Sequence, residues 1–177
     1  MPRLDATLEA LKQWDARACA RLNRAARLRP LAALFRGVSW LGAGIFWYAL
    51  MLGLLLAYGA EAALPVAHMI GVGITCTLLY RVLKLGTLRP RPYEVHAHIA
   101  AGAAPLDRFS FPSGHALHAV AFTLIALAYY PALTLLLVPV TALVAASRMV
   151  LGLHYPSDVL AGAAVGASVA LASFSLA

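Results

Sequence analysis

Three short polar clusters interrupt an otherwise apolar chain. They are KLGTLRPRP at 84–92, PSGH at 112–115 and SRMVLGLHYPSD at 147–158. Each cluster lies at the end of an apolar run, and together they hold histidines, a carboxylate and several cations. These residue types suit the binding and transfer of a phosphate group, provided that the fold brings the clusters together.

The cations and one helix start supply groups that hold a phosphate. Lys84, Arg91 and Arg148 provide positive charge, and a guanidinium presents a planar fork that matches phosphate oxygens. Ser113 and Gly114 follow a proline at the head of an apolar run, where a helix would offer free backbone N–H groups and the positive end of its dipole. Such groups would also stabilise the extra negative charge of a pentavalent phosphorus transition state.

Two histidines and an aspartate fit the roles of nucleophile, acid and orienting base. His154 precedes Asp158 by four residues, with Pro156 between them at a plausible helix start. A neutral imidazole attacks through one nitrogen while the other keeps its proton, and Asp158 would fix that tautomer and stabilise the charged ring. His115 would donate a proton to the leaving oxygen.

Each cluster taken alone also has an ordinary structural interpretation. Lys84 and Arg89 would extend toward polar surroundings from a helix end, and Ser113 would simply cap a helix. The joint arrangement of three clusters favours chemistry over these alternatives. The other histidines are interpreted as loop or bundle residues and are left out of the site: His96, His98 and His118.

Composition indicates an integral membrane protein of one domain's length. Of the 177 residues, 62% are hydrophobic and 12% charged, and the mean hydropathy is +0.80. The formal net charge of +7 is embedded among apolar runs, which fits phospholipid headgroups or a phosphorylated lipid better than nucleic acid. Cys19 and Cys76 are isolated and lack metal-ligand spacing. Nothing in the sequence specifies an oligomeric state.

Hydropathy predicts an all-α fold, a transmembrane bundle of about five spans behind an N-terminal amphipathic helix. Residues 4–29 place leucines on one side and arginines on another, as in a helix lying in the membrane interface; a solvated connector helix is the alternative. No secretory signal is visible. We expect a basic helix and linker over 1–36 and a transmembrane domain over 37–177. The predicted spans are 37–60, 62–80, 114–130, 132–150 and 159–177.

The alternation of spans decides whether the clusters can meet. The second span ends where the third begins, near the first and second clusters, and the fourth ends where the fifth begins, near the third cluster. Two crossings separate the second cluster from the third, so all three emerge on one membrane face. The turns at 59–63 and 130–131 and the C-terminus belong to the other face.

These residues resemble the three motifs of the type 2 phosphatidic acid phosphatase family of membrane lipid phosphatases. Six residues separate Lys84 from Arg91-Pro92, and Pro112-Ser113-Gly114-His115 follows in order. Five residues then separate Arg148 from His154, and three separate His154 from Asp158. The motifs cover residues 84–158, and the flanking spans fit the family's helical bundle.

The resemblance implies a metal-independent reaction, without cofactor, through a phosphohistidine. It makes His154 the nucleophile, Asp158 its orienting partner and His115 the general acid. The residues that would hold the phosphate are Lys84, Arg91, Arg148, Ser113 and Gly114. The expected partners are the bilayer and a lipid phosphate such as phosphatidic acid, phosphatidylglycerol phosphate or a polyprenyl diphosphate. The alternatives are a lipid phosphotransferase using the same phosphohistidine and a non-catalytic lipid-phosphate binder.

Topology leaves two orientations open. Family members often have six spans, and here the N-terminal helix replaces the first. All Lys and Arg residues belong to the face with the site, which under the positive-inside rule is cytoplasmic. Bacterial relatives commonly place the site on the periplasmic face. The expected location is therefore a bacterial inner membrane, with the side of the active site open.

Overall fold

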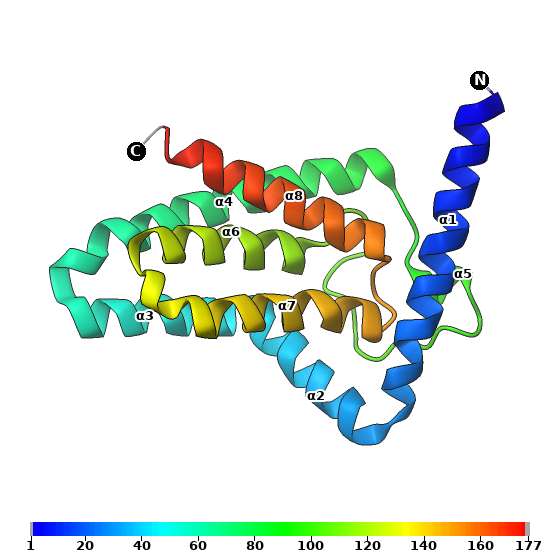
Figure 1. Cartoon of the computed structure of the whole chain (residues 1–177), viewed down its shortest axis with the longest axis horizontal. Helices are drawn as coiled ribbons and strands as arrows, with labels where there is room; N and C mark the ends of the chain where they lie inside the picture. The colour runs from blue at the N-terminus through cyan, green and yellow to red at the C-terminus, as the bar shows by residue number, and fades with distance from the viewer. Residues whose placement is uncertain (1, 176–177) are drawn as a thin grey trace.

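The computed structural model describes residues 2–175, which form helices joined by turns and loops, and no strand occurs among them. The longer helices run side by side as a bundle, and α1 crosses one end of it (Figure 1). The helices are α1 (Pro2–Asn23), α2 (Arg29–Trp40), α3 (Phe46–Tyr58), α4 (Ala63–Thr87), α5 (Pro92–Val95), α6 (Gly114–Tyr129), α7 (Thr134–Val150) and α8 (Pro156–Ser173).

The bundle has the length and surface of a membrane-spanning protein. Among residues 2–175, three helical stretches are long and apolar enough to cross a bilayer: 29–95, which is interrupted at 88–91, Pro131–Val150 and Pro156–Ser173. The first reverses at Gly59–Ala62 and so contains both α3 and α4, and α6 is a shorter apolar helix. Large apolar side chains face outward, which suits contact with lipid tails rather than water. The predicted multi-span helical bundle is confirmed.

The predicted spans agree with the helices at most of their ends. The turn predicted at Tyr130-Pro131 is present as a 3₁₀ segment, Pro131–Leu133, and α6 and α7 end close to the predicted limits. The span predicted at 62–80 was too short, because the prediction stopped at the first charge whereas α4 continues to Thr87. The last predicted span starts three residues after the start of α8, and its residues 176–177 lie outside the described residues.

The N-terminal region differs from the single helix predicted over 4–29. Helix α1 ends at Asn23, a 3₁₀ turn follows at Arg24–Arg27, and α2 begins at Arg29. Pro30, the predicted break, lies in the first turn of α2, where a missing N–H is tolerated. Helix α2 runs across position 36, the predicted domain limit, and continues through a π-helical segment at Leu41–Ile45 into α3. Gly44 in that segment has φ 144°, which only glycine adopts readily.

Two glycines of α8 bring it into backbone contact with α6. A Cβ on Gly162 would lie 2.4 Å from the Ser113 carbonyl oxygen, and one on Gly166 would lie 2.2 Å from the Leu117 oxygen. Any side chain at these positions would push the helices apart. This close approach sets the start of α8, which carries the third cluster, beside the start of α6, which carries the second.

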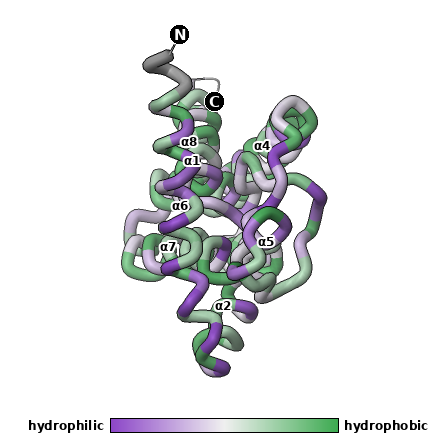
Figure 2. The backbone as a smooth tube through the Cα atoms, turned by 90° about the vertical axis from the view of Figure 1, so that its right-hand side faces the viewer, coloured by the Kyte–Doolittle hydropathy of each residue, from purple (hydrophilic) through white to green (hydrophobic). Residues whose placement is uncertain are grey.

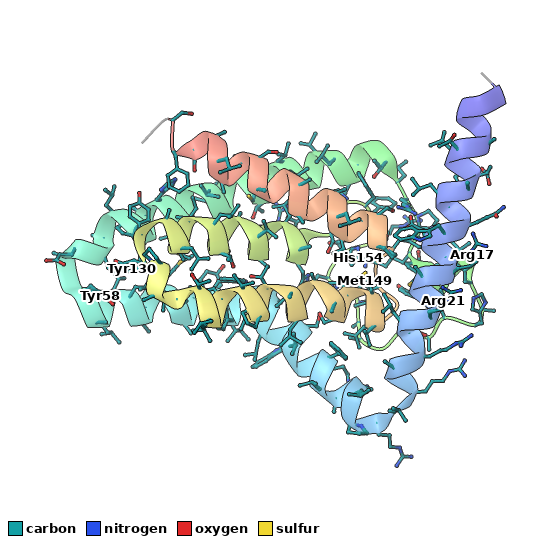
Figure 3. The ribbon with its side chains drawn as sticks, in the orientation of Figure 1. Arg17, Arg21, Tyr58, Tyr130, Met149 and His154 are labelled. Carbon is teal, nitrogen blue, oxygen red and sulfur yellow. The ribbon has the colours of Figure 1, made fainter. Side chains whose placement is uncertain are left out.

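All three clusters lie at one end of the bundle. In Figure 3 His154 and Met149 lie at the end crossed by α1, whereas Tyr58 and Tyr130 lie at the opposite end. Figure 2 looks onto the first end and shows hydrophilic segments along α1, around α5 and in the connecting loops. The arrangement agrees with the face predicted from the alternation of spans.

Candidate active site

A cavity of about 390 Å³ joins residues from all three clusters. Its polar end lies where α4, α6 and α7 meet the loops, and its walls there include six of the eight predicted site residues: Lys84, Arg91, Gly114, His115, Arg148 and His154. The two remaining residues, Ser113 and Asp158, are fully buried behind the wall.

The cavity also has an apolar arm that extends along α3 and α4. Tyr48 and Met51 of α3 face Ile70, Ile74 and Leu78 of α4 across it. The π-helical segment contributes glycines to the wall in place of bulky side chains. The site therefore accepts a molecule with a polar head and an apolar continuation at the depth of the bundle.

The three cations at the polar end are buried and carry more charge than the protein neutralises. Lys84 donates from Nζ to Asp107 Oδ1 at 2.6 Å and to the Phe109 oxygen at 2.8 Å. Arg91, which is 1% exposed, donates from Nη2 to the same Asp107 oxygen at 2.8 Å. Arg148 donates from Nη1 to Ser39 Oγ, its Nε has no partner, and within residues 2–175 it pairs with no carboxylate. A buried excess of cations favours an anionic ligand.

Asp107 was not predicted, yet its carboxylate bridges two of the predicted phosphate ligands. Burial alone would raise the pKa of the Asp107 carboxyl, but its hydrogen bond and ion pair with Lys84, together with Arg91, hold that pKa below its ordinary value. The residue lies in the long loop before α6, where no motif or periodicity marks it. Only the folding of that loop over the cations reveals it.

His154 presents an unprotonated nitrogen to the cations. Arg91 Nη1 lies 3.3 Å from His154 Nε2, and a guanidinium only donates, so Nε2 accepts and the ring proton is on Nδ1. Burial, and then the positive charges of Arg148, Arg91 and Lys84, lower the pKa of His154 well below its ordinary value of 6.5. The imidazole is therefore neutral near pH 7, and an electrophile in the cavity would reach its Nε2 lone pair by displacing the bond from Arg91.

Asp158 lies on the Nδ1 side of His154, at a distance of 3.7 Å between Oδ2 and Nδ1. That distance is too long for a hydrogen bond. Oδ2 instead accepts from the Tyr155 backbone N–H at 2.7 Å and from Ser110 Oγ. Oδ1 accepts from Arg89 Nη1 at 2.7 Å. Asp158 is thus held by several donors while it faces the histidine.

Within the PSGH cluster, one residue caps helix α6 and two line the cavity. Ser113 is the N-cap of α6, where its Oγ accepts from the Ala116 backbone N–H at 3.5 Å, and it is not among the cavity-lining residues. Gly114 and His115, in the first turn of α6, do line the cavity. The helix start therefore contributes Gly114 and His115 to the cavity wall that the cations also line, and the Ser113 side chain, also predicted to hold the phosphate, does not reach it.

Sequence reasoning also missed a carboxylate of α1. Asp15 is 1% exposed and accepts from Arg89 Nη2 at 2.8 Å, next to the contact between Arg89 and Asp158. With Cys19 and Asn23 it forms a buried stripe at four-residue spacing, distinct from the leucine and arginine sides. That spacing was the available signal.

Comparisons with known proteins found one matching family model and several similar phosphatases. The family model described as PAP2 superfamily matches residues 62–177. Decaprenylphosphoryl-5-phosphoribose phosphatase of Mycobacterium tuberculosis is 40% identical over 111 residues, 62% of this chain and 55% of the relative. Lipid A 1-phosphatase of Rhizobium johnstonii is 28% identical over 158 residues, 87% of this chain and 54% of the relative. The chain spans about half the length of these curated relatives.

Two solved structures share the fold over most of their length. A transmembrane PAP2-type phosphatidylglycerolphosphate phosphatase from Bacillus subtilis has a TM-score of 0.72 at 26% identity, covering 94% of this chain and 86% of its own. Aquifex aeolicus LpxE has a TM-score of 0.75 at 26% identity, covering 88% and 92%. The family match, the fold and the three motifs agree, and the chain belongs to the PAP2 superfamily, the family of type 2 phosphatidic acid phosphatases that its motifs predicted.

Proposed function

We propose that the chain is a lipid phosphate phosphatase of a bacterial inner membrane. The observation that carries the proposal is the neutral His154, whose Nε2 faces a cavity with uncompensated buried cations at one end and an apolar arm at the other. The relatives reported above are named as phosphatases of lipid substrates, which supports the same class of reaction. A helical bundle favours the inner membrane, since outer-membrane proteins are built as barrels.

The proposed reaction proceeds in two displacements at phosphorus. His154 Nε2 attacks the phosphorus atom, the bond from phosphorus to the lipid oxygen breaks, and His115 gives its proton to that oxygen. Lys84, Arg91 and Arg148 stabilise the charge on the non-bridging oxygens, with the helix start at Gly114. Asp158 stabilises the positive charge that develops on the imidazole.

The second displacement releases the phosphate. His115 takes a proton from a water molecule as that water attacks the phosphorus atom of the phosphohistidine. The phosphorus–nitrogen bond then breaks, and inorganic phosphate leaves. The steps as drawn need no metal or cofactor, because the cations of the chain itself supply the electrophilic stabilisation.

The apolar arm supports a lipid as the leaving group. Its walls along α3 and α4 are apolar at the depth of the bilayer core, while the phosphate site lies at the level of the helix ends. A lipid lying in the bilayer would present its phosphate at that level and its tail to the arm. Substrate candidates are phosphatidic acid, phosphatidylglycerol phosphate, polyprenyl diphosphates, decaprenylphosphoryl-5-phosphoribose and the 1-phosphate of lipid A.

A substrate panel tests the proposal. Purified protein in detergent is incubated with each candidate lipid phosphate, and inorganic phosphate is measured for the parent, His154→Ala and His98→Ala. His98 is an exposed loop histidine outside the cavity, so it controls for loss of an imidazole. We expect release from at least one lipid by the parent and His98→Ala, and none by His154→Ala. No release by the parent, or equal release by His154→Ala, would contradict the proposal.

A substrate with a labelled phosphate then tests for the phosphohistidine intermediate and identifies the molecule that accepts the phosphate. A phosphate bound to the protein that survives alkali but not acid is expected in the parent and absent from His154→Ala. Activity that persists with excess chelator supports the metal-independent route. Label that appears on a second lipid instead of in inorganic phosphate would identify a phosphotransferase.

A further inference from the structure

Helix α1 contributes a buried carboxylate to the hydrogen bonds behind His154. Asp15 Oδ2 accepts from Arg89 Nη2 at 2.8 Å and from Ser157 Oγ, and its Oδ1 accepts from the Ser157 backbone N–H at 3.0 Å. Ser157 lies in the first turn of α8, whose N-cap residue Tyr155 makes no side-chain capping bond. Asp15 therefore caps α8 from another helix, where a negative charge is favoured.

Arg89 connects this carboxylate to Asp158. Its Nη1 donates to Asp158 Oδ1 at 2.7 Å while its Nη2 holds Asp15, so one guanidinium is shared by two buried carboxylates. The Arg89 guanidinium carbon also lies 4.2 Å from the centre of the Tyr155 ring, which fixes its plane. Arg89 does not line the cavity, so it reaches the reaction only through Asp158.

Because Arg89 is shared between Asp15 and Asp158, the presence of Asp15 affects how firmly the Asp158 carboxylate is held near His154. With Asp15 present, the charge of Arg89 is divided between two carboxylates, and the Asp158 carboxylate stays oriented toward Nδ1 at 3.7 Å. Without Asp15, Arg89 would either pair with Asp158 alone or turn toward solvent, since its side chain is 26% exposed. Either change alters the position or the effective charge of Asp158 when the imidazole becomes positive.

We propose that Asp15 is a positioning residue for the reaction, acting through Arg89 to hold Asp158 against His154. The inference rests on the proposed function and assigns α1 a part in the site beyond membrane attachment. Asp15 lies outside the region matched by the family model, which begins at residue 62. Phosphate binding at Lys84, Arg91 and Arg148 does not involve this link, so the effect falls on kcat rather than on KM.

Steady-state kinetics in a double-mutant cycle separate positioning from general stability. We expect Asp15→Asn to lower kcat on the order of ten- to a hundredfold, with KM within about threefold, because a charge-assisted bond is lost. In an Asp158→Asn background the same substitution should change kcat by less than about twofold. Equal losses in both backgrounds, or a rise in KM with kcat intact, would overturn the proposal.

Two variants guard against a mere folding effect. Arg89→Gln breaks the same link from the other side and should reproduce the loss of kcat. Asn23→Ala loosens the docking of α1, since Asn23 donates to the Val150 oxygen at 2.9 Å and to the Ala100 oxygen at 3.0 Å, but it does not touch Arg89. It should lower the melting temperature without the dependence on Asp158. If Asn23→Ala shows that dependence too, the role of Asp15 is structural.

A readout without turnover keeps the inference separate from the proposed function. In protein labelled with nitrogen-15 histidine, with the ring of His154 assigned by His154→Gln, we expect the Nδ1 resonance to shift in Asp15→Asn while Nε2 stays unprotonated, because Arg91 still donates to Nε2. An unchanged Nδ1 resonance in Asp15→Asn would overturn the inference, whether or not any lipid is hydrolysed. A parent that releases no phosphate while Asp15→Asn shifts the Nδ1 resonance would contradict only the proposed function.

Discussion

The Asp107 carboxylate bridges Lys84 and Arg91, two of the cations that bind phosphate in the proposed reaction, so its removal should strengthen phosphate binding. The carboxylate accepts from Lys84 Nζ at 2.6 Å and from Arg91 Nη2 at 2.8 Å. Two charge-assisted bonds are worth about 1.5–3 kcal/mol each before losses. Because the Asp107 side chain is 35% exposed, water and solvent screening replace much of this when the carboxylate leaves, and about 1–2 kcal/mol remains.

That free energy sets the expected change. Phosphate must displace the carboxylate, and about 1–2 kcal/mol corresponds to a site open in only a few to some fifteen per cent of molecules. Asp107→Asn should therefore lower the inhibition constant of inorganic phosphate by about five- to thirtyfold. The pKa of the Asp107 carboxyl is lowered, so the carboxylate stays charged at every pH above its ordinary titration range. The difference between the inhibition constants of the parent and Asp107→Asn should persist at those pH values and be lost as the pH falls through the lowered pKa.

Competitive inhibition of lipid hydrolysis by inorganic phosphate measures this constant for each variant. Glu94→Gln is the matched control, since Glu94 of α5 carries the same charge but accepts from the Arg91 backbone N–H, not from its guanidinium. We expect its inhibition constant to stay within about twofold of the parent's. A constant for Asp107→Asn that rises or does not change would refute the reasoning and would mean that Asp107 orients the cations instead of competing for them.

Three further predictions follow from the same geometry. His115→Gln should reduce kcat for a lipid phosphate by about 10²- to 10⁴-fold, and much less for an aryl phosphate whose leaving oxygen needs no proton. The pKa of His154 is lowered in the enzyme without substrate, so the fall of kcat/KM at acid pH that reflects its protonation should lie below pH 6.5 in a pH–rate profile. A fall centred at or above pH 6.5 would contradict the neutral imidazole. Gly166→Ala should lower the melting temperature in detergent, because its Cβ would lie 2.2 Å from the Leu117 oxygen, a contact that costs about 1–3 kcal/mol to relieve.

The spans and the main site residues could be predicted because local rules govern them. Apolar runs of span length and the turn at Tyr130-Pro131 follow from hydropathy and from proline geometry alone. The number of crossings between clusters then decides which helix ends share a face, without any knowledge of packing. For that reason Lys84, Arg91, Arg148 and His154 could be expected at one end of the bundle.

The residues that were missed depend on packing between distant segments. Asp107 reaches the cations only because the loop before α6 folds over them, and Ser39 reaches Arg148 only because α2 packs on α7. Neither residue has a periodicity or a motif that indicates its partner. The end of α4 was placed too early for a related reason. Charge ordinarily marks the end of a span, and the prediction stopped before Arg81, but α4 continues past this exposed residue to Lys84, which is buried in its last turn against loop acceptors.

Helix α1 carries an exposed apolar side and a buried polar side. Its leucine and tryptophan side remains exposed, with Leu8 53% and Trp14 47% accessible, and the helix crosses the end of the bundle as an interfacial helix would (Figure 1). Its buried stripe is instead polar, and Cys19 Sγ donates to the His154 oxygen at 3.7 Å beside the contacts of Asp15. Because the two sides do not overlap, the apolar side can enter the interface while the polar stripe stays bonded to the loops. With α1 in the interface, as its sequence predicts, the same partition would hold Asp15 against the start of α8.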